Sequence, residues 1–135
     1  MTTPLPTDAP DILPEARPFW EATGRGELAL QRCSQCDTVI WYPRGLCPNC
    51  LSSDIAWFTA SGRGVVYSFT ISRKGDGAFR EASPFVLAYV ELDEGPRILT
   101  NVVDVDLETI RIGMPVRAVF QETGAGISLV RFTAT

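Results

Sequence analysis

Histidine is absent from the 135-residue sequence. Its absence excludes a Ser-His-Asp triad, a Cys-His pair and any metal site with imidazole ligands. Chemistry performed by this chain alone would have to use carboxylates, Tyr, Lys or Cys. The acidic pairs Asp93–Glu94 and Asp104–Asp106 lie in or beside turns, where such side chains are usually just solvated. An independent enzyme is thus an alternative, but the sequence offers no recognisable pair of nucleophile and base for it.

Concentrated positive charge is also missing. The net charge is −4, and Lys and Arg do not gather into a basic block. Nucleic acid is therefore not expected as the main partner, because phosphate binding needs concentrated positive charge. Tyr67, Phe69 and Tyr89 could stack on bases, but Tyr67 and Phe69 share an alternating face that we expect to fill a core.

Long apolar runs are missing as well. No stretch reaches the roughly eighteen apolar residues of a membrane span, so no contact with a membrane is expected. The first residues, MTTPLPTDAPDILPEARP, have neither the basic start nor the apolar segment of a signal peptide. We therefore expect a cytoplasmic protein, and in that compartment cysteines are usually reduced.

The four cysteines form two close pairs, Cys33-x2-Cys36 and Cys47-x2-Cys50. Two residues between cysteines let one tight turn direct both sulfurs at the same ion, and two such turns supply a tetrahedral site. Structural zinc is the predicted metal; iron in a rubredoxin-like site and a redox dithiol are the alternatives. Four thiolates leave no open position, so the predicted role of the metal is to stabilise a small fold.

The residues that follow each pair are unusual for such turns. Knuckles commonly place Gly after the second Cys, where the chain turns left-handed, but here those positions hold Asp37 and Leu51. Asp tolerates this conformation, whereas Leu adopts it at a cost. We therefore expect the second knuckle to turn differently from the first.

The order of the predicted elements indicates a mainly β protein. Residues 1–30 are predicted to form an N-terminal arm and a short helix. The arm is extended over residues 1–13, and the helix lies within 14–23, where Pro18 either limits it or begins it. Residues 31–60 are read as a four-Cys zinc ribbon, and residues 61–135 as a five-stranded barrel of OB type, with an SH3-like barrel as the alternative. The ribbon strands are predicted at 27–32, 39–42 and 54–58, the barrel strands at 64–73, 85–92, 97–103, 114–121 and 127–132, and a helical turn at 107–110.

In the first barrel strand, Val65, Tyr67, Phe69 and Ile71 alternate and are predicted to share one face. The second, FVLAYVEL, is nearly apolar on both faces, which predicts a central strand.

Several segments in order resemble one known family. They are GELALQRC, the two CxxC pairs with YPR between them, SGRGVVYSFT, SPFVLAYVELDEG, TNVV and IRIGMPVRAVF. The family combines a rubredoxin-like zinc ribbon with an OB fold, is also called acyl-CoA-associated, and has long been labelled domain of unknown function thirty-five. The resemblance covers about residues 17–133, and the segment WYPR departs from the Phe-Pro-Pro-like stretch of many members.

The resemblance implies an accessory subunit of a thiolase-like acyl-CoA enzyme in a hetero-oligomer. Family members accompany thiolase-like enzymes, hydroxymethylglutaryl-CoA synthase, MaoC-type hydratases and steroid side-chain aldolases. The most concrete version is an aldolase that cleaves a β-hydroxyacyl-CoA of a steroid or acyl side chain, with the catalytic residues on the partner. A stand-alone acyl-CoA binding module, or a scaffold for the other enzymes, is the alternative.

Two sets of residues are candidates for these contacts. A ribbon this small cannot bury its large aromatic residues alone, so some must pack on the barrel or on a partner. The candidates for the partner interface are Phe19, Trp20, Trp41, Tyr42 and Trp57. Four cations flank the first barrel strand and the loop after it and could face CoA phosphates, although solvated loop charges are the simpler interpretation: Arg63, Arg73, Lys74 and Arg80.

Overall fold

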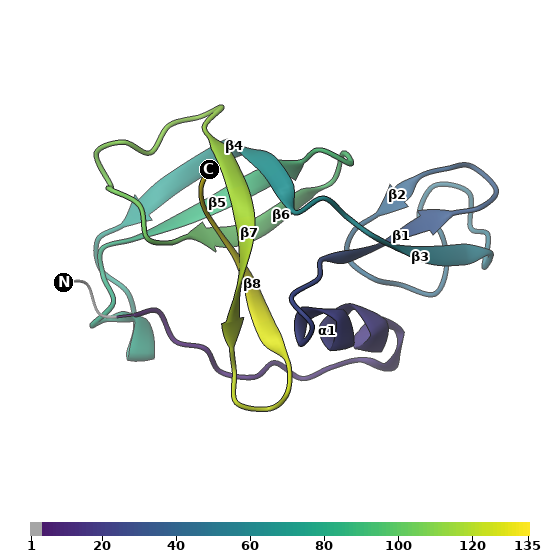
Figure 1. Ribbon diagram of the computed structural model, residues 1–135, viewed down its shortest axis with the longest axis horizontal. Coiled ribbons are helices and arrows are strands. Elements are labelled where there is room, and N and C mark those ends of the chain that lie inside the picture. Colours follow the sequence, from purple (N-terminus) through teal and green to yellow (C-terminus); the bar gives the residue numbers. More distant parts are fainter. Residues whose placement is uncertain (1–3) are drawn as a thin grey trace.

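The computed structural model describes residues 4–135, and the first three residues of the predicted arm lie outside it. The chain forms two lobes, a barrel and a smaller ribbon, with a helix packed where they meet (Figure 1). The helical segment opens with the 3-10 turn η1 (Pro14–Ala16) and continues as α1 (Arg17–Thr23), with proline at the first positions of both. Proline suits these positions because the first helical N–H groups have no intrahelical acceptor.

The ribbon contains β1 (Ala29–Cys33), β2 (Val39–Ile40) and β3 (Ile55–Thr59). They form an antiparallel sheet in the order β2-β1-β3. The ribbon has a small core of its own, made of Cys33, Ile40 and Cys47 with Cys36 and Ile55 against them. Three strands around so few apolar residues need a further source of stability, as the sequence predicted.

The second lobe is a closed five-stranded barrel in the order β4-β5-β6-β8-β7. Its strands are β4 (Arg63–Ser72), β5 (Phe85–Leu92), β6 (Arg97–Val102), β7 (Pro115–Glu122) and β8 (Ser128–Ala134). Neighbours are antiparallel except β6 and β8, which run parallel. The mainly β architecture, with one short helix, a four-cysteine ribbon and a closed barrel, confirms the predicted fold class.

The barrel core extends into the helix and the base of the ribbon. Phe19, Leu28 and Leu30 belong to the same buried cluster as the barrel residues Val66, Val90 and Phe132. All six side chains are at most 2% exposed. The ribbon is therefore anchored on the barrel through a shared core, with no free linker between them.

One prediction about the first barrel strand is wrong. Val66 is fully buried, whereas Val65 and Tyr67 are 37% and 46% exposed. The pairing of β4 with β5 shifts register between Val66 and Ser68, so a β-bulge inserts one residue into the alternation. Beyond the bulge Phe69 and Ile71 do pack against the core. The four residues therefore do not share one face.

The connections also differ from the prediction in detail. Residues 107–109 form a hydrogen-bonded turn where a helical turn was expected over 107–110, with Thr109 N–H donating to the carbonyl of Asp106 at 2.9 Å. The Asp106 carboxylate accepts from the Glu108 N–H at 3.0 Å, a side-chain bond that favours a turn over helix. A 3-10 turn that was not predicted, η2 (Gly77–Phe79), lies between β4 and β5. Among residues 4–135, no helix is long and apolar enough to cross a membrane.

Candidate metal centre and partner surfaces

The two cysteine pairs lie in matching turns. In the first, Asp37 N–H donates to the carbonyl of Cys33 at 2.9 Å; in the second, Leu51 N–H donates to that of Cys47, also at 2.9 Å. Asp37 has φ 62° and Leu51 has φ 67°. The expectation that the second knuckle turns differently is therefore wrong, and Leu51 adopts the left-handed conformation that a leucine reaches only at a cost.

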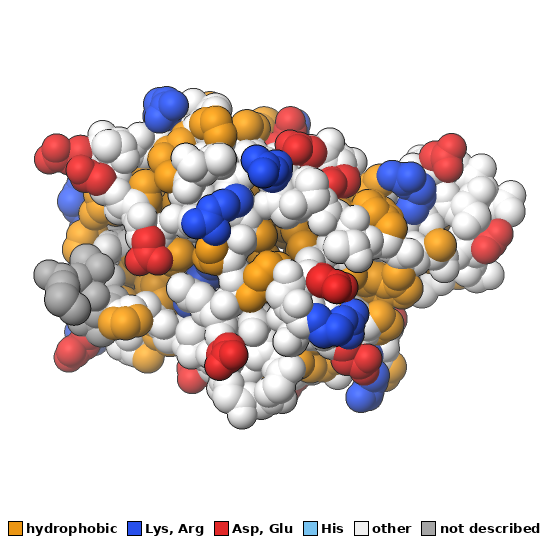
Figure 2. All heavy atoms as spheres, viewed as in Figure 1, with side chains coloured by type: hydrophobic (Ala, Val, Ile, Leu, Met, Phe, Trp, Pro, Cys, Tyr) orange, Lys and Arg blue, Asp and Glu red, His pale blue; other side chains and the backbone are white. Residues whose placement is uncertain are grey.

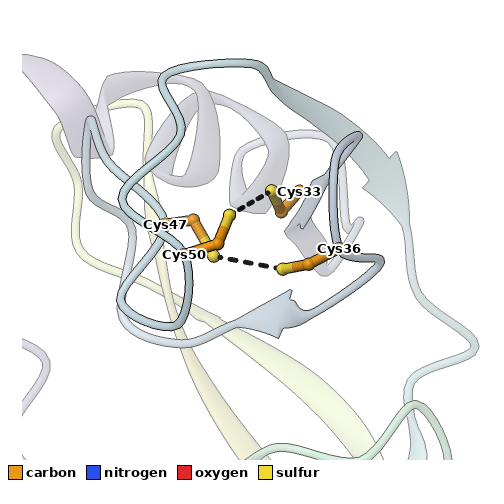
Figure 3. Close-up of side chains that lie close together, drawn as sticks. All are labelled: Cys33, Cys36, Cys47 and Cys50. Atoms are coloured by element: carbon orange, nitrogen blue, oxygen red, sulfur yellow. Dashed lines mark hydrogen bonds between the residues drawn. The ribbon is translucent and has the colours of Figure 1, made fainter.

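The four sulfurs converge on one point between the knuckles (Figure 3). All four lie within 4.8 Å of one another, with Sγ separations of 3.5 Å for Cys33–Cys50 and 3.6 Å for Cys36–Cys47. Zinc with four sulfurs at about 2.3 Å places those sulfurs about 3.8 Å apart. The arrangement therefore fits a structural zinc ion, and four thiolates leave no position for substrate or water.

The environment of the four thiols is uneven. Hydrogen bonds from the Thr38 side chain and backbone, and from Asn49, lower the pKa of Cys36 to about 6. For Cys50 the Ser52 backbone lowers the pKa, but the other three thiols and partial desolvation of the sulfur outweigh it and raise the pKa to about 12. Cys33 and Cys47 are buried, and Cys50 is exposed. The knuckles therefore supply donors that favour a thiolate at Cys36, which is the form that binds metal.

The aromatic residues predicted for a partner interface mostly contact one another. The Phe19 ring meets those of Trp20, Trp41 and Tyr42 edge-on at 4.9, 5.3 and 6.2 Å between centroids. Trp20 Nε1 donates to the Tyr42 hydroxyl at 3.0 Å. Phe19 is 2% exposed and therefore acts as a packing residue, whereas the other three stay partly exposed. Hydrophobic side chains gather at this junction of the two lobes (Figure 2).

Trp57, the fifth aromatic candidate, lies apart from this group on β3. It is half-buried and packs against the edge of the barrel core.

The four cations predicted to face CoA phosphates do not lie together. Arg63 begins β4, while Arg73 and Lys74 follow its other end. A strand of this length spans on the order of 30 Å, because each residue rises about 3.3 Å. Arg80 follows η2 in the same loop as Arg73 and Lys74, and the loop is closed by the Gly75 N–H donating to Ser83 Oγ at 2.7 Å. All four side chains are exposed.

The sequence did not predict an apolar outer face on the barrel. We call this surface the sheet face; its members lie on β4, β5 and β6 and are 37–56% exposed, namely Val65, Tyr67, Leu87, Tyr89 and Leu99. Tyr89 pairs directly with Leu99. The Arg97 guanidinium covers the Tyr67 ring at 3.8 Å and binds Glu91 at 2.9 Å. The available signal was the two-sided apolarity of β5, which was used only to predict a central strand.

A closed four-cysteine ribbon joined to a five-stranded barrel defines a class of small zinc-ribbon and OB-fold proteins. Residues 20–56 match the family model described as ChsH2, rubredoxin-like zinc ribbon domain. Residues 57–121 match the model described as ChsH2, C-terminal OB-fold domain. The chain therefore belongs to the ChsH2 (DUF35) family of zinc-ribbon and OB-fold proteins, as the sequence motifs indicated.

Relatives of the chain include both short and long proteins. A DUF35 domain-containing scaffold protein of Methanothermobacter thermautotrophicus is 33% identical over 99 residues, covering 73% of this chain and 74% of that protein. A probable enoyl-CoA hydratase alpha subunit of Thermomonospora curvata is 41% identical over 99 residues. The match covers 73% of this chain but only 31% of the hydratase subunit, so the chain spans about a third of that relative.

A solved structure is similar over nearly its whole length. A chain of the Ltp2-ChsH2(DUF35) aldolase superposes with a TM-score of 0.83 and 35% sequence identity, covering 93% of this chain and 98% of that chain. This chain is thus homologous to ChsH2 (DUF35) subunits of acyl-CoA hydratase and aldolase complexes.

Proposed function

We propose that this chain is a non-catalytic accessory subunit that docks on a thiolase-like acyl-CoA enzyme. In its most concrete form the complex is an aldolase that cleaves a β-hydroxyacyl-CoA thioester of a steroid or acyl side chain. The partner supplies the residues that break the carbon–carbon bond. A complex with a thiolase, a hydroxymethylglutaryl-CoA synthase or a MaoC-type hydratase is the alternative within the same class.

The chemistry of the metal centre supports a structural role for this chain. The tetrad consists of four thiols in two matching knuckles, and four thiolates saturate tetrahedral zinc. The ion then stabilises the ribbon and takes no part in binding substrate. The proposal accordingly assigns the catalytic groups of the complex to the partner.

The sheet face is the observation that carries the proposal. Five large apolar side chains gather on one side of a three-stranded sheet, each at least 37% exposed. Contiguous exposed apolar surface of this kind marks interaction sites in soluble proteins. The charges within it are already paired, because Arg97 binds Glu91. Docking a partner here would bury apolar area without leaving a charge unpaired.

Co-purification tests the proposal. The tagged chain should retain an untagged thiolase-like enzyme encoded beside it, and the pair should elute together in size-exclusion chromatography. The double variant Tyr89→Ser, Leu99→Ser should lose the partner, because two central apolar contacts become polar. Leu13→Ser is the matched control, since Leu13 is 58% exposed but lies outside the sheet face. A chain that stays alone beside a fully active neighbour contradicts the proposal.

A second candidate function is binding of the CoA phosphates by the loop after β4. Arg73, Lys74 and Arg80 are exposed on one loop, and no ion pair engages them within residues 4–135. Arg63 lies at the other end of β4 and would need a different phosphate or the partner enzyme. Calorimetric titration with acetyl-CoA tests this function, and the absence of heat at millimolar ligand excludes it.

A further inference from the structure

A groove lies between the helix-and-ribbon aromatic residues and the barrel. Trp20, Trp41 and Tyr42 line one side, and Leu99, Leu129 and Arg131 line the other. Its volume is about 290 Å³. Sites for small molecules often lie where two parts of a fold meet and combine apolar walls with a few polar groups. The groove has this composition, with aromatic and aliphatic walls and one cation.

The groove follows from incomplete pairing between β6 and β8. The two strands share one residue pair, Val102 with Phe132, and beside it Val103 N–H donates to the Phe132 carbonyl at 2.7 Å. Further along, a side chain bridges the strands, since Thr100 Oγ1 donates to the Val130 carbonyl at 3.2 Å. The strands therefore diverge on the side where the aromatic rings stand, and the rings only partly fill the space.

Arg131 is a buried cation without a carboxylate partner in the described part of the chain. It is 5% exposed, and burial lowers its pKa. Nη1 donates to Gln121 Oε1 at 2.5 Å, and Nη2 donates to the Pro6 carbonyl at 2.6 Å. Both acceptors are neutral. Buried charges are usually paired, as Arg97 is with Glu91 on the sheet face.

Arg131 also retains hydrogen-bonding capacity. A guanidinium carries five N–H groups, and the two bonds to Gln121 and Pro6 use two of them. The Pro6 carbonyl belongs to the N-terminal arm, which a ligand at Nη2 could displace. A carboxylate matches the fork geometry of arginine better than a single carbonyl does.

We propose that this groove binds a small apolar carboxylate, with its apolar part against Trp20, Trp41 and Leu129 and its carboxylate on Arg131. The aromatic walls exclude water from the apolar part, and the carboxylate supplies the missing counter-charge. This site adjoins the sheet face, with which it shares Leu99, and it is separate from the metal centre. It requires no partner protein, so the isolated chain suffices to test it.

Tryptophan fluorescence provides the readout. The variant Trp57→Phe removes the tryptophan that does not line the groove and leaves Trp20 and Trp41 as reporters. Octanoate is the probe, and 1-octanol is the neutral probe of the same length. We expect octanoate to bind about tenfold or more tightly than octanol, because a charge-assisted hydrogen bond adds to the same apolar contact. Equal affinity for the two probes, or no response at millimolar octanoate, would overturn the proposal.

Substitutions test whether octanoate binds in the groove. Arg131→Gln should weaken octanoate binding about tenfold while leaving octanol binding unchanged, and Arg131→Lys should restore part of the loss. Because Arg131→Gln could unfold the arm or the barrel, a second pair of variants tests the site with Arg131 left in place. Leu129→Trp should fill the groove and abolish binding of both probes, whereas Leu87→Trp, on the sheet face, should not. Octanoate affinity that survives Leu129→Trp places the probe elsewhere and refutes the site.

Discussion

Asp37 and Leu51 occupy equivalent positions in the two knuckles, with φ values of 62° and 67°. Each donates its N–H to the carbonyl of the first cysteine of its pair at 2.9 Å. The two halves of the metal centre are thus built alike from unlike residues. Because the backbone conformation is the same, the two side chains differ in what this conformation costs, and the cost is higher for Leu51 than for Asp37.

The substitution Leu51→Gly should therefore stabilise the zinc-loaded protein. A left-handed leucine costs roughly 1–2 kcal/mol, and glycine is free of most of this cost, although its greater freedom in the unfolded chain offsets part of the gain. Leu51 is 73% exposed, so little packing is lost. Urea unfolding should show a gain of up to about 1 kcal/mol. A loss of stability would contradict the prediction and would mean that the Leu51 side chain makes a stabilising contact.

Removal of the metal should unfold the ribbon. Structural zinc contributes on the order of 10–16 kcal/mol in small zinc peptides, and the ribbon core contains few other apolar residues. Elemental analysis should find one zinc per chain, and a strong chelator should abolish the near-ultraviolet dichroism of the aromatic cluster. Cys47→Ser should prevent zinc binding, whereas Ser53→Ala, at an exposed ribbon position, should not. A chain that keeps its near-ultraviolet signal without metal contradicts the prediction.

Gln31 should be essential for positioning the segment before the second knuckle. It is 4% exposed, and its side chain accepts from the Arg44 N–H at 2.9 Å and donates to the Arg44 carbonyl at 3.0 Å. Gln31→Ala leaves both backbone groups without their partner, at a cost of about 1–3 kcal/mol each if they stay buried. Thermal unfolding should show a clear loss. Arg32→Ala, at the exposed neighbouring position on the other side of β1, is the comparison. It should cost less than about 1 kcal/mol, because Arg32 loses only its exposed contact with the Phe58 ring at 4.8 Å.

Thr23 should act as a bridge between α1 and β8. Its hydroxyl donates to the Trp20 carbonyl at 2.5 Å and accepts from the Ser128 N–H at 3.0 Å, and the side chain is 1% exposed. Thr23→Val keeps the shape but leaves the Ser128 N–H unpaired, which should cost about 1–3 kcal/mol. Amide hydrogen exchange should accelerate at Ser128. Thr23→Ser retains the hydroxyl and should preserve that protection; if it does not, the methyl group and not the bond is responsible.

The parts of this structure that depend on local pattern could be predicted from the sequence. The cysteine spacing indicated the knuckles, and the apolar run of β5 (Phe85–Leu92) indicated a central strand. The bulge at Val66–Ser68 could not be predicted, because consecutive apolar residues fit either face and the partner strand decides between them. The burial of Arg131 could likewise not be predicted, because the segment that covers it includes Pro6, whose carbonyl it contacts from 125 positions further along the chain.

The shared core has a consequence for any attempt to divide the chain. Phe19, Leu28 and Leu30 belong to the buried cluster of the barrel, so truncation at residue 61 would remove three large apolar side chains from the core that contains Val66 and Phe132. The excised barrel should be prone to aggregation even though its five strands are intact. The helix and the ribbon therefore complete the core of the barrel. A transplant of this barrel into another protein must begin upstream of Pro14.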